Sequence, residues 1–355
     1  MIDPSLNPLA EDLDHILAHT RDLWEELRGQ RIFITGGTGF FGCWLLESFA
    51  WANDKLHLNA EAFVLSRNPD AFEKKAPHLF RHAAIRLRKG NIQDFDYPQG
   101  RFSCLIHAAV FQQPADARPS NLSMAHEMLT GTRRILDFCA AAEIRKMLLI
   151  STGAVYGKAS TQLKKIPETF TGAFDPTATT SAYHQVRRMM EALCAMYAEE
   201  NDFEAKIARC FSFIGPYLPM DGRFATADFI QNALSGGCLT IQGDGKAVRS
   251  YLYMADLAIW LWWILFKGTS CRPYNVGSEL PLTIRQLAEA VADVSNPPLP
   301  ISILNLNVSG VAPQHYVPDT ERAGLDLGLK QHISLTQAIR KTIGWFADDV
   351  NEKGL

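Results

Sequence analysis

The stretch RIFITGGTGFFGCWLL, residues 31–46, constrains the fold of this chain more than any other part of the sequence. Three glycines at three-residue spacing, Gly36, Gly39 and Gly42, separate a β-rich run from an apolar run of helical character. Gly36 permits a tight turn, Gly39 lets backbone N–H groups approach a pyrophosphate, and Gly42 lets the helix pack against the strand. The N-terminal end of the helix dipole favours an anion. The stretch therefore predicts a site for the phosphates of a dinucleotide, formed by Gly36, Thr38, Gly39, Phe40, Phe41 and Gly42.

The composition is that of a globular protein. The chain has 355 residues, 47% hydrophobic and 21% charged, which is enough for a large core. Its net charge of -3 gives no general attraction to nucleic acid or anionic lipid. Seven cysteines occur singly, which predicts reduced thiols, a cytoplasmic location and no metal site. The longest apolar run, residues 257–266, is too short to cross a bilayer, so we expect no membrane partner.

Strand-like and helix-like segments alternate after the glycine loop. The predicted strands are residues 62–66, 85–89, 103–108, 146–151 and 205–211. The predicted helices are residues 121–142 and 181–200, and a further amphipathic helix at 10–28 precedes the loop. This alternation predicts an α/β fold with a Rossmann-type doubly wound parallel sheet.

Beyond Pro216, glycine and proline turns separate shorter elements, with helices expected at 223–235, 283–294 and 334–346. We therefore expect an N-terminal helical extension at 1–29 and a dinucleotide-binding Rossmann domain at 30–215. Residues 216–355 would form mainly a smaller α/β substrate-binding lobe, interleaved with segments that return to the Rossmann domain.

Two further motifs carry a family resemblance. STGAVYG at 151–157 ends a predicted strand, and YHQVR at 183–187 opens a predicted helix. Four more segments accompany them, namely RCFSFIGP at 209–216, QGDG at 242–245, RSYLYMAD at 249–256 and YNVG at 274–277. With these motifs the chain resembles the extended short-chain dehydrogenases/reductases, in their branch of NAD(P)-dependent nucleotide-sugar epimerases and dehydratases. The resemblance implies an enzyme with a nucleotide-sugar substrate, and a homodimer built on the helices at 121–142 and 181–200.

The resemblance assigns catalysis to Tyr183, Thr152 and Arg187. In the family the tyrosine is the acid/base that moves a hydroxyl proton while hydride passes between the sugar and the nicotinamide. Thr152 matches the serine or threonine that hydrogen-bonds to the reacting oxygen and contacts the substrate. The usual helper is a lysine four residues after the tyrosine, but this chain has Arg187. Arginine keeps its charge permanently and can still donate to the nicotinamide ribose.

The two residues after Thr152 narrow the reaction. The 4,6-dehydratases of the family carry an Asp-Glu pair there, whereas this chain has Gly153 and Ala154, which exchange no protons. Their absence disfavours dehydration and, for lack of the same glutamate, decarboxylation. We expect a reductase that acts on a keto group at C4. The alternatives are a 4-epimerase with tightly bound NAD(P) and a non-catalytic dinucleotide-binding protein.

The choice of cofactor depends on the end of the second predicted strand. NAD-dependent proteins place an Asp or Glu there, against the ribose hydroxyls. This chain has Ser66 followed by Arg67, which can pair with a 2′-phosphate, so we expect NADP(H), with NAD(H) as the alternative. The resemblance adds Asn91 and Ile92 at the adenine and Ala108 and Ala109 at a strand end beside the cofactor. We expect the neighbouring His107 to be structural.

Substrate contacts follow from the same resemblance. Arg249 matches an arginine that binds the nucleotide diphosphate, and a guanidinium fork suits phosphate. Ser212 stands where the family commonly has an asparagine. Gln112, Gln113 and Arg118 follow a predicted strand end, where they could contact a sugar or simply form a polar loop.

Overall fold

The computed structural model describes residues 7–110, 120–157, 163–222, 224–295, 297–305 and 314–353. They belong to two compact units. The first, unit 1, comprises Met1–Gly157, Gly172–Cys210 and Ala258–Tyr274. The second, unit 2, comprises Lys158–Thr171, Phe211–Leu257 and Asn275–Leu355. The chain passes between the units several times, so neither unit is one continuous segment.

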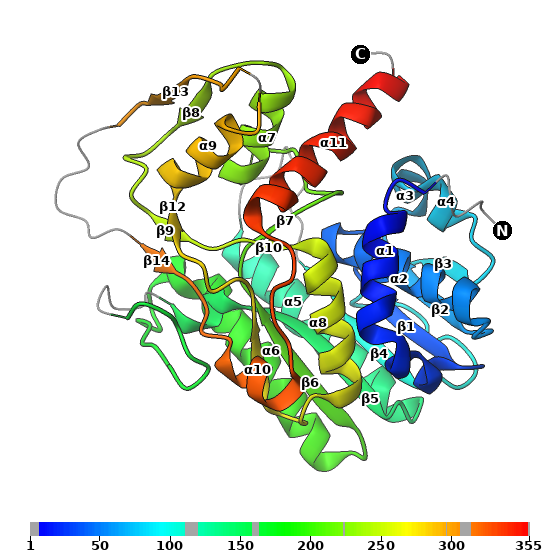
Figure 1. Ribbon diagram of the computed structural model, residues 1–355. Helices are drawn as coiled ribbons and strands as arrows, with labels where there is room; N and C mark the ends of the chain where they lie inside the picture. The colour runs from blue at the N-terminus through cyan, green and yellow to red at the C-terminus, as the bar shows by residue number, and fades with distance from the viewer. Residues whose placement is uncertain are drawn as a thin grey trace. The chain divides into compact units, whose positions relative to one another are not determined.

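Unit 1 is built on a parallel sheet. Its strands are β1 (Arg31–Thr35), β2 (Glu61–Ser66), β3 (Ile85–Lys89), β4 (Cys104–His107), β5 (Lys146–Thr152) and β6 (Glu204–Cys210). With β11 (Pro273–Val276) at the edge, the order is β11-β6-β5-β4-β1-β2-β3, and the pairs from β6 to β3 are parallel (Figure 1). The predicted α/β fold with a doubly wound parallel sheet is confirmed. The order reverses between β1 and β4, the point at which such sheets open a crevice for ligands.

Helices cover both faces of this sheet (Figure 1). One face carries α2 (Phe40–Leu56) and α8 (Met254–Lys267), joined by a hydrogen bond of 2.9 Å from Trp262 Nε1 to Ser48 Oγ. The other carries α5 (Asn121–Ala141) and α6 (Ala182–Glu200), which pack against each other. The aromatic core under α5 includes Phe33 of β1, whose ring centroid lies 5.0 Å from that of Phe138. Within the described part of the chain, no helix is long and apolar enough to cross a membrane.

The predicted helix at 10–28 is partly wrong. It is α-helical only in α1 (Ala10–Thr20), beside α2, and continues as the 3₁₀ helix η2 (Arg21–Leu27). At the junction the Thr20 hydroxyl donates to the Ile16 carbonyl oxygen at 2.7 Å and accepts from Trp24 Nε1 at 2.9 Å. This side-chain bonding competes with the regular helical ladder and draws the buried Trp24 inward, which accounts for the tighter turn.

Unit 2 contains shorter elements. Its helices are α7 (Ala225–Leu234), α9 (Ile284–Ala292), α10 (Glu321–Leu327) and α11 (Leu335–Lys353). Its strands include β7 (Phe213–Ile214), β8 (Leu239–Ile241), β9 (Val248–Arg249), β10 (Leu252–Tyr253), β12 (Leu282–Thr283), β13 (Ile301–Ile303) and β14 (His315–Tyr316). They form the small sheets β12-β9-β14, β13-β8 and β10-β7. The predicted helices at 223–235, 283–294 and 334–346 correspond to α7, α9 and the first part of α11.

We predict that Gly42→Ala destabilises the protein by about 2 kcal/mol, because overpacking against rigid neighbours has costs of this order. A Cβ on Gly42 would lie 2.3 Å from the Gly36 carbonyl oxygen and 2.4 Å from the Gly37 carbonyl carbon, and both of these are backbone atoms. Denaturant unfolding measures the loss. The matched control is Gly344→Ala, also in a helix, where nothing outside that stretch of helix lies within 4 Å of the added Cβ among the described residues. Equal stabilities for the two variants would contradict the close approach of α2 to the glycine loop after β1.

Candidate functional site

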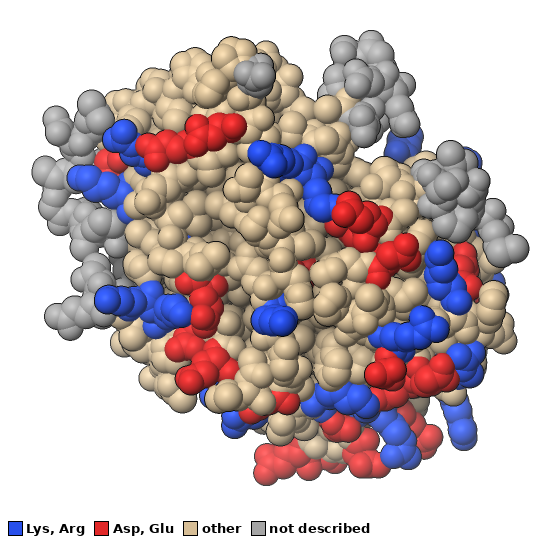
Figure 2. All heavy atoms as spheres, viewed as in Figure 1, with Lys and Arg blue, Asp and Glu red and all other residues tan. Residues whose placement is uncertain are grey.

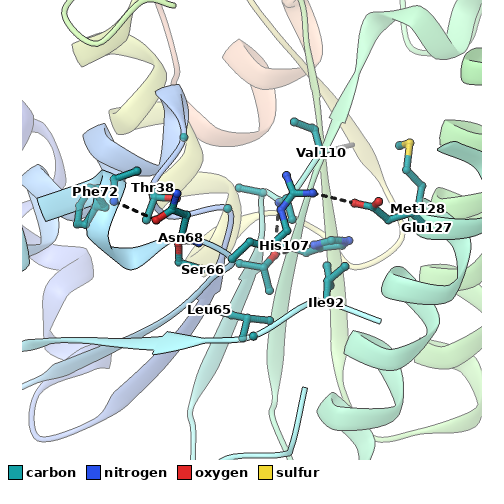
Figure 3. A pocket seen from close by; sticks show the side chains of 18 of the residues that line it. Thr38, Leu65, Ser66, Asn68, Phe72, Ile92, His107, Val110, Glu127 and Met128 are labelled. Carbon is teal, nitrogen blue, oxygen red and sulfur yellow. Dashed lines mark hydrogen bonds and ion pairs between the residues drawn. The ribbon is translucent and has the colours of Figure 1, made fainter. Parts of the chain in front are cut away.

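A cavity of about 390 Å³ lies in unit 1 at the carboxyl edge of the sheet. Its walls come from the glycine loop, the ends of β2 and β4, and the helix α5 (Figure 3). Eight of the predicted cofactor residues line it, namely Gly36, Thr38, Gly39, Ser66, Arg67, Ile92, Ala108 and Ala109. Phe40, Phe41, Gly42, Asn91, Tyr183 and Arg187 are not among its lining residues.

The glycine loop forms a narrow cradle at one end of this cavity. Gly36 has a φ of +70°, and a Cβ there would lie 2.5 Å from the carbonyl carbon of Ala108 and 2.6 Å from the amide nitrogen of Ala109. Gly39 is the N-cap of the 17-residue helix α2 and has no side chain to occupy the first backbone N–H groups of that helix. Backbone N–H groups at the N-terminus of a helix favour an anion, which lies there in the field of the helix dipole. The cradle fits the phosphates of a dinucleotide.

His107, the last residue of β4, lines the cavity and connects β4 to β1 and α5 by hydrogen bonds. The Thr132 hydroxyl of α5 donates to the Met128 carbonyl oxygen at 2.7 Å and therefore accepts from His107 Nε2 at 3.2 Å. His107 Nδ1 then accepts from the hydroxyl of Thr35, on β1, at 2.8 Å. Burial, assisted by the charge of Arg187, lowers the pKa of His107 to about 3. The imidazole is thus neutral and fully hydrogen-bonded, which fits a structural role.

Three predicted catalytic residues come from β5 and the start of α6, which pack against each other. Thr152 is the last residue of β5, and its Oγ1 accepts from the Ala154 N–H at 3.1 Å. Tyr183 is 36% exposed in the first turn of α6. Arg187 lies one turn later, with its Cζ 6.0 Å from the centroid of the Tyr183 ring. The strand and the helix therefore hold a hydroxyl, a phenol and a cation in one region of unit 1.

Arg187 is a buried cation. It is 2% exposed, and its Nη2 donates to the Ile150 carbonyl oxygen at 2.5 Å. Its Nε is buried without a hydrogen-bond partner among the described residues. A buried N–H without an acceptor costs free energy, so the guanidinium is held here at a cost to stability. The larger guanidinium is thus accommodated where the family has a lysine.

Sequence reasoning missed a buried ion pair behind these residues. Arg209 of β6 donates from Nη2 to Glu191 Oε2 of α6 at 2.7 Å and from Nη1 to the Tyr156 hydroxyl at 2.9 Å. Glu191 Oε1 also accepts from the Ser151 hydroxyl at 2.5 Å, directly beside Thr152. The network fastens α6 to β5 and β6. A glutamate two helical turns after Tyr183, on the same helix face, was the signal available in the sequence.

A second missed residue is Glu127, which lines the cavity from α5. Its Oε1 lies 3.3 Å from Nη1 of Arg67, the residue predicted to bind a 2′-phosphate. Figure 3 shows Glu127 across the cavity from Ser66 and Asn68, with a dashed line to this guanidinium. Nothing in the local sequence pairs two residues that lie 60 positions apart.

The predicted substrate residues Ser212 and Arg249 belong to unit 2. Arg249 donates from Nη2 to Gln314 Oε1 at 2.8 Å, and its Cζ lies 5.6 Å from the centroid of the Tyr316 ring. The Ser212 carbonyl oxygen accepts from the Leu252 N–H at 3.1 Å, which joins the start of β7 to β10. Gln112, Gln113 and Arg118 lie outside the described residues.

Residues 32–277 match the model of the NAD dependent epimerase/dehydratase family. The chain belongs to this family. The predicted resemblance is thereby confirmed, and the protein is an enzyme of the epimerase/dehydratase family whose cavity fits a dinucleotide.

Curated relatives of this epimerase/dehydratase family member share about a quarter of its residues. UDP-glucuronic acid decarboxylase 1 of Xenopus tropicalis is 26% identical over 325 residues, which cover 91% of this chain and 74% of that protein. UDP-glucuronic acid decarboxylase 5 of Arabidopsis thaliana is 26% identical over 313 residues, 87% of each chain.

Solved structures share the fold of this family member. The UDP-glucose 4-epimerase of Thermotoga maritima, solved with UDP-glucose, has a TM-score of 0.75 at 20% identity, covering 90% of this chain and 99% of that one. The dTDP-glucose 4,6-dehydratase of Bacillus anthracis, solved with NAD, has a TM-score of 0.72 at 17% identity, covering 91% and 98%. These TM-scores show that the chain shares the Rossmann-type architecture of both proteins.

We predict that His107 makes folding stability fall as the pH drops below about 6.5. The unfolded histidine binds a proton near its ordinary pKa of 6.5, whereas the folded one does so only near about 3. The unfolded state therefore binds more protons between these values, and stability decreases by about 1.4 kcal/mol per pH unit on acidification.

The check is urea unfolding of the wild type and His107→Gln at several pH values. The variant should be less stable at pH 7.5, because Thr35 and Thr132 lose a partner, and this deficit should shrink as the pH falls from 6.5. A deficit that stays constant with pH would contradict a buried neutral imidazole.

Proposed function

We propose that the protein transfers a hydride between NADP(H) and C4 of a nucleotide-linked sugar, acting as a keto reductase. The observation that carries the proposal is the end of β5, where Thr152 is followed by Gly153 and Ala154 at the start of the 3₁₀ helix η3 (Gly153–Tyr156). This segment offers a hydroxyl but no carboxyl group. It therefore has no acid to protonate a leaving sugar hydroxyl and no carboxylate to abstract a carbon-bound proton. Tyr183 and Arg187, one helical turn apart, supply the proton transfer that a carbonyl reduction needs.

The cavity would hold the dinucleotide along the walls described above. Gly36, Gly39 and the N-terminus of α2 would meet the pyrophosphate, and Arg67 the 2′-phosphate of NADP(H). Ile92 and Ala108 line the cavity between these regions. When bound, the nicotinamide supplies or accepts the hydride. The relatives named above act on nucleotide-linked sugars according to their names, which supports a substrate of that class.

Proton transfer is the task of this chain's own residues. The Tyr183 hydroxyl donates its proton to the sugar oxygen as the carbonyl becomes an alcohol, and it accepts the proton in the reverse direction. The Arg187 guanidinium stabilises the phenolate that donation leaves, since it carries a permanent charge near the ring. The Thr152 hydroxyl both donates and accepts, so it can hold the same sugar oxygen in place.

A 4-epimerase is the second candidate. It needs the same three side chains and, like the reductase, no acid at the positions of Gly153 and Ala154. The two reactions differ in what happens to the dinucleotide: an epimerase keeps it through the cycle, whereas a reductase exchanges it at each turnover.

The first experiment identifies the bound dinucleotide. The freshly purified protein is denatured, any released dinucleotide is identified by mass spectrometry, and the emptied protein is titrated with NADPH and NADH. An empty protein that prefers NADPH and oxidises it with a nucleotide-linked 4-keto sugar supports the reductase. Tightly retained NAD⁺ together with interconversion of UDP-, dTDP-, GDP- or CDP-hexose epimers, followed by NMR, would replace it with the epimerase.

We predict that Tyr183→Phe lowers kcat by at least about 100-fold, the typical contribution of a positioned acid/base. The affinity for NADPH and the melting temperature should stay near those of the wild type, because this side chain is partly exposed. Tyr97→Phe is the matched control, since its hydroxyl makes only a long 3.4 Å bond to the Arg134 carbonyl oxygen away from the cavity. A Tyr183→Phe variant that keeps the kcat of the wild type would contradict the role of Tyr183 as proton donor.

We also propose a cytoplasmic homodimer that has no nucleic-acid or membrane partner. On the face drawn in Figure 2, basic and acidic side chains lie interspersed. The adjacent helices α5 and α6 expose large apolar side chains, with Leu122 82%, Met189 43% and Met196 43% exposed. Exposed apolar groups gathered on neighbouring helices are typical of a protein–protein interface.

The dimer is tested by Met196→Glu, which should convert a dimer to a monomer because it buries a charge in the proposed interface. Light scattering measures the mass at several protein concentrations. Leu325→Glu, which alters a side chain that is 78% exposed on α10, is the control and should leave the dimer intact. A monomeric wild type would remove the proposal.

A further inference from the structure

The end of β2 carries an unusual combination of charges for a dinucleotide site. Proteins that bind NAD place an acid there, against the hydroxyls of the adenosine ribose. In this chain Arg67 follows β2, and the acid comes instead from Glu127 of α5, on the opposite wall of the cavity (Figure 3). The two side chains meet with Nη1 and Oε1 3.3 Å apart. The cavity therefore holds both a carboxylate and a guanidinium at one end.

This ion pair lies in contact with solvent. The Arg67 side chain is 45% exposed and that of Glu127 is 22% exposed. Pairs this exposed are weak, because water and salt screen the attraction, so an incoming anion can displace the carboxylate. A second cation, Lys75, also lines the cavity, and its Nζ donates to the Thr38 carbonyl oxygen at 3.2 Å. Two cations, Arg67 and Lys75, and one anion, Glu127, thus line the cavity.

We propose that Glu127 determines how strongly the protein prefers NADP(H) over NAD(H). With NAD(H), the Glu127 carboxylate accepts a hydrogen bond from the ribose 2′-hydroxyl and so replaces the acid missing after β2. With NADP(H), the 2′-phosphate must replace the Glu127 carboxylate as the ion-pair partner of Arg67. The carboxylate then lies near the phosphate and repels it, because both are negative. Glu127 therefore makes the preference for NADP(H) over NAD(H) smaller than it would be with Arg67 alone. The inference rests on the proposed function only in requiring that the cavity bind these dinucleotides.

The test is a pair of binding titrations, by calorimetry, of NADPH and NADH to the full chain and to Glu127→Gln. Glutamine keeps the shape of the side chain and removes its charge. The dissociation constant for NADPH should fall and that for NADH should rise, so that their ratio moves by about tenfold toward NADPH, which corresponds to about 1.4 kcal/mol. The melting temperature checks that the variant is folded.

The matched control is Glu73→Gln, which removes the same charge from the neighbouring helix α3 (Pro69–Lys75). Glu73 pairs with Arg81 and does not line the cavity. Its ratio of dissociation constants should stay within about twofold of the wild type, well below the tenfold shift expected for Glu127→Gln. An equal shift in both variants, or none in Glu127→Gln, overturns the proposal.

The double variant Arg67→Ala, Glu127→Gln distinguishes two effects of Glu127: competition with the 2′-phosphate for Arg67, and direct repulsion of the phosphate. If Glu127 acts by holding Arg67, removing the carboxylate should improve NADPH binding less when Arg67 is absent. An undiminished improvement would overturn the competition. The proposed reaction can fail separately: no nucleotide sugar would then turn over, although both dinucleotides still bind and Glu127→Gln still shifts their ratio. If Glu127→Gln leaves the ratio of the two dissociation constants unchanged and the wild type turns over a nucleotide sugar, only the role of Glu127 is overturned.

Discussion

The candidate site depends on the close approach of two backbone segments at the carboxyl edge of the sheet. The chain leaves β1 through Gly36 and leaves β4 through Ala108, and a Cβ on residue 36 would lie only 2.5 Å from the Ala108 carbonyl carbon. These strands are neighbours at the point where the strand order reverses. Because the two loops pass so near each other, the N-cap residue Gly39 and the end of β4 line the same cavity. A side chain at position 36 would separate these walls.

Two buried polar networks hold this edge in place. Thr35, His107 and Thr132 join β1, β4 and α5, whereas Ser151, Glu191 and Arg209 join β5, α6 and β6. In each network the loss of one member would leave another buried polar group without its partner, which gives the networks a strong effect on geometry. Helix α6, which carries Tyr183 at its start, is thereby anchored to the strand that ends at Thr152.

The charges of the site fall into two classes with different physical behaviour. Arg187 is buried, so water screens its charge weakly, and its Cζ lies 6.0 Å from the centroid of the Tyr183 ring. Arg67 is exposed and Glu127 is half-buried, so solvent weakens their attraction and a bound phosphate can replace it. A buried cation suits a constant catalytic role, and an exposed pair suits the selection of a ligand.

The fold class, most helices and strands, and the glycine loop could be predicted from the amino-acid sequence. Period-two and helical patterns placed β2, β3, β5, α5 and α6 within a residue or so, because their buried faces repeat with the period of the element. The glycines were recognisable since only glycine has the conformational freedom that the turn at Gly36 needs. The change from α1 to η2 could not be predicted, because it depends on the hydrogen bonds of the Thr20 hydroxyl and the Trp24 indole and not on a periodic pattern.

Tertiary structure alone decided which charges meet. Glu127 reaches Arg67 across 60 positions, and Glu191 binds Arg209 of another strand, although each is an ordinary glutamate in the sequence. From the sequence, the missing acid after β2 and the presence of Arg67 favour NADP(H), with NAD(H) as the alternative. In the folded protein, Glu127 of α5 places an acid beside Arg67. This is possible because a parallel sheet brings together the ends of strands and helices that lie far apart along the chain.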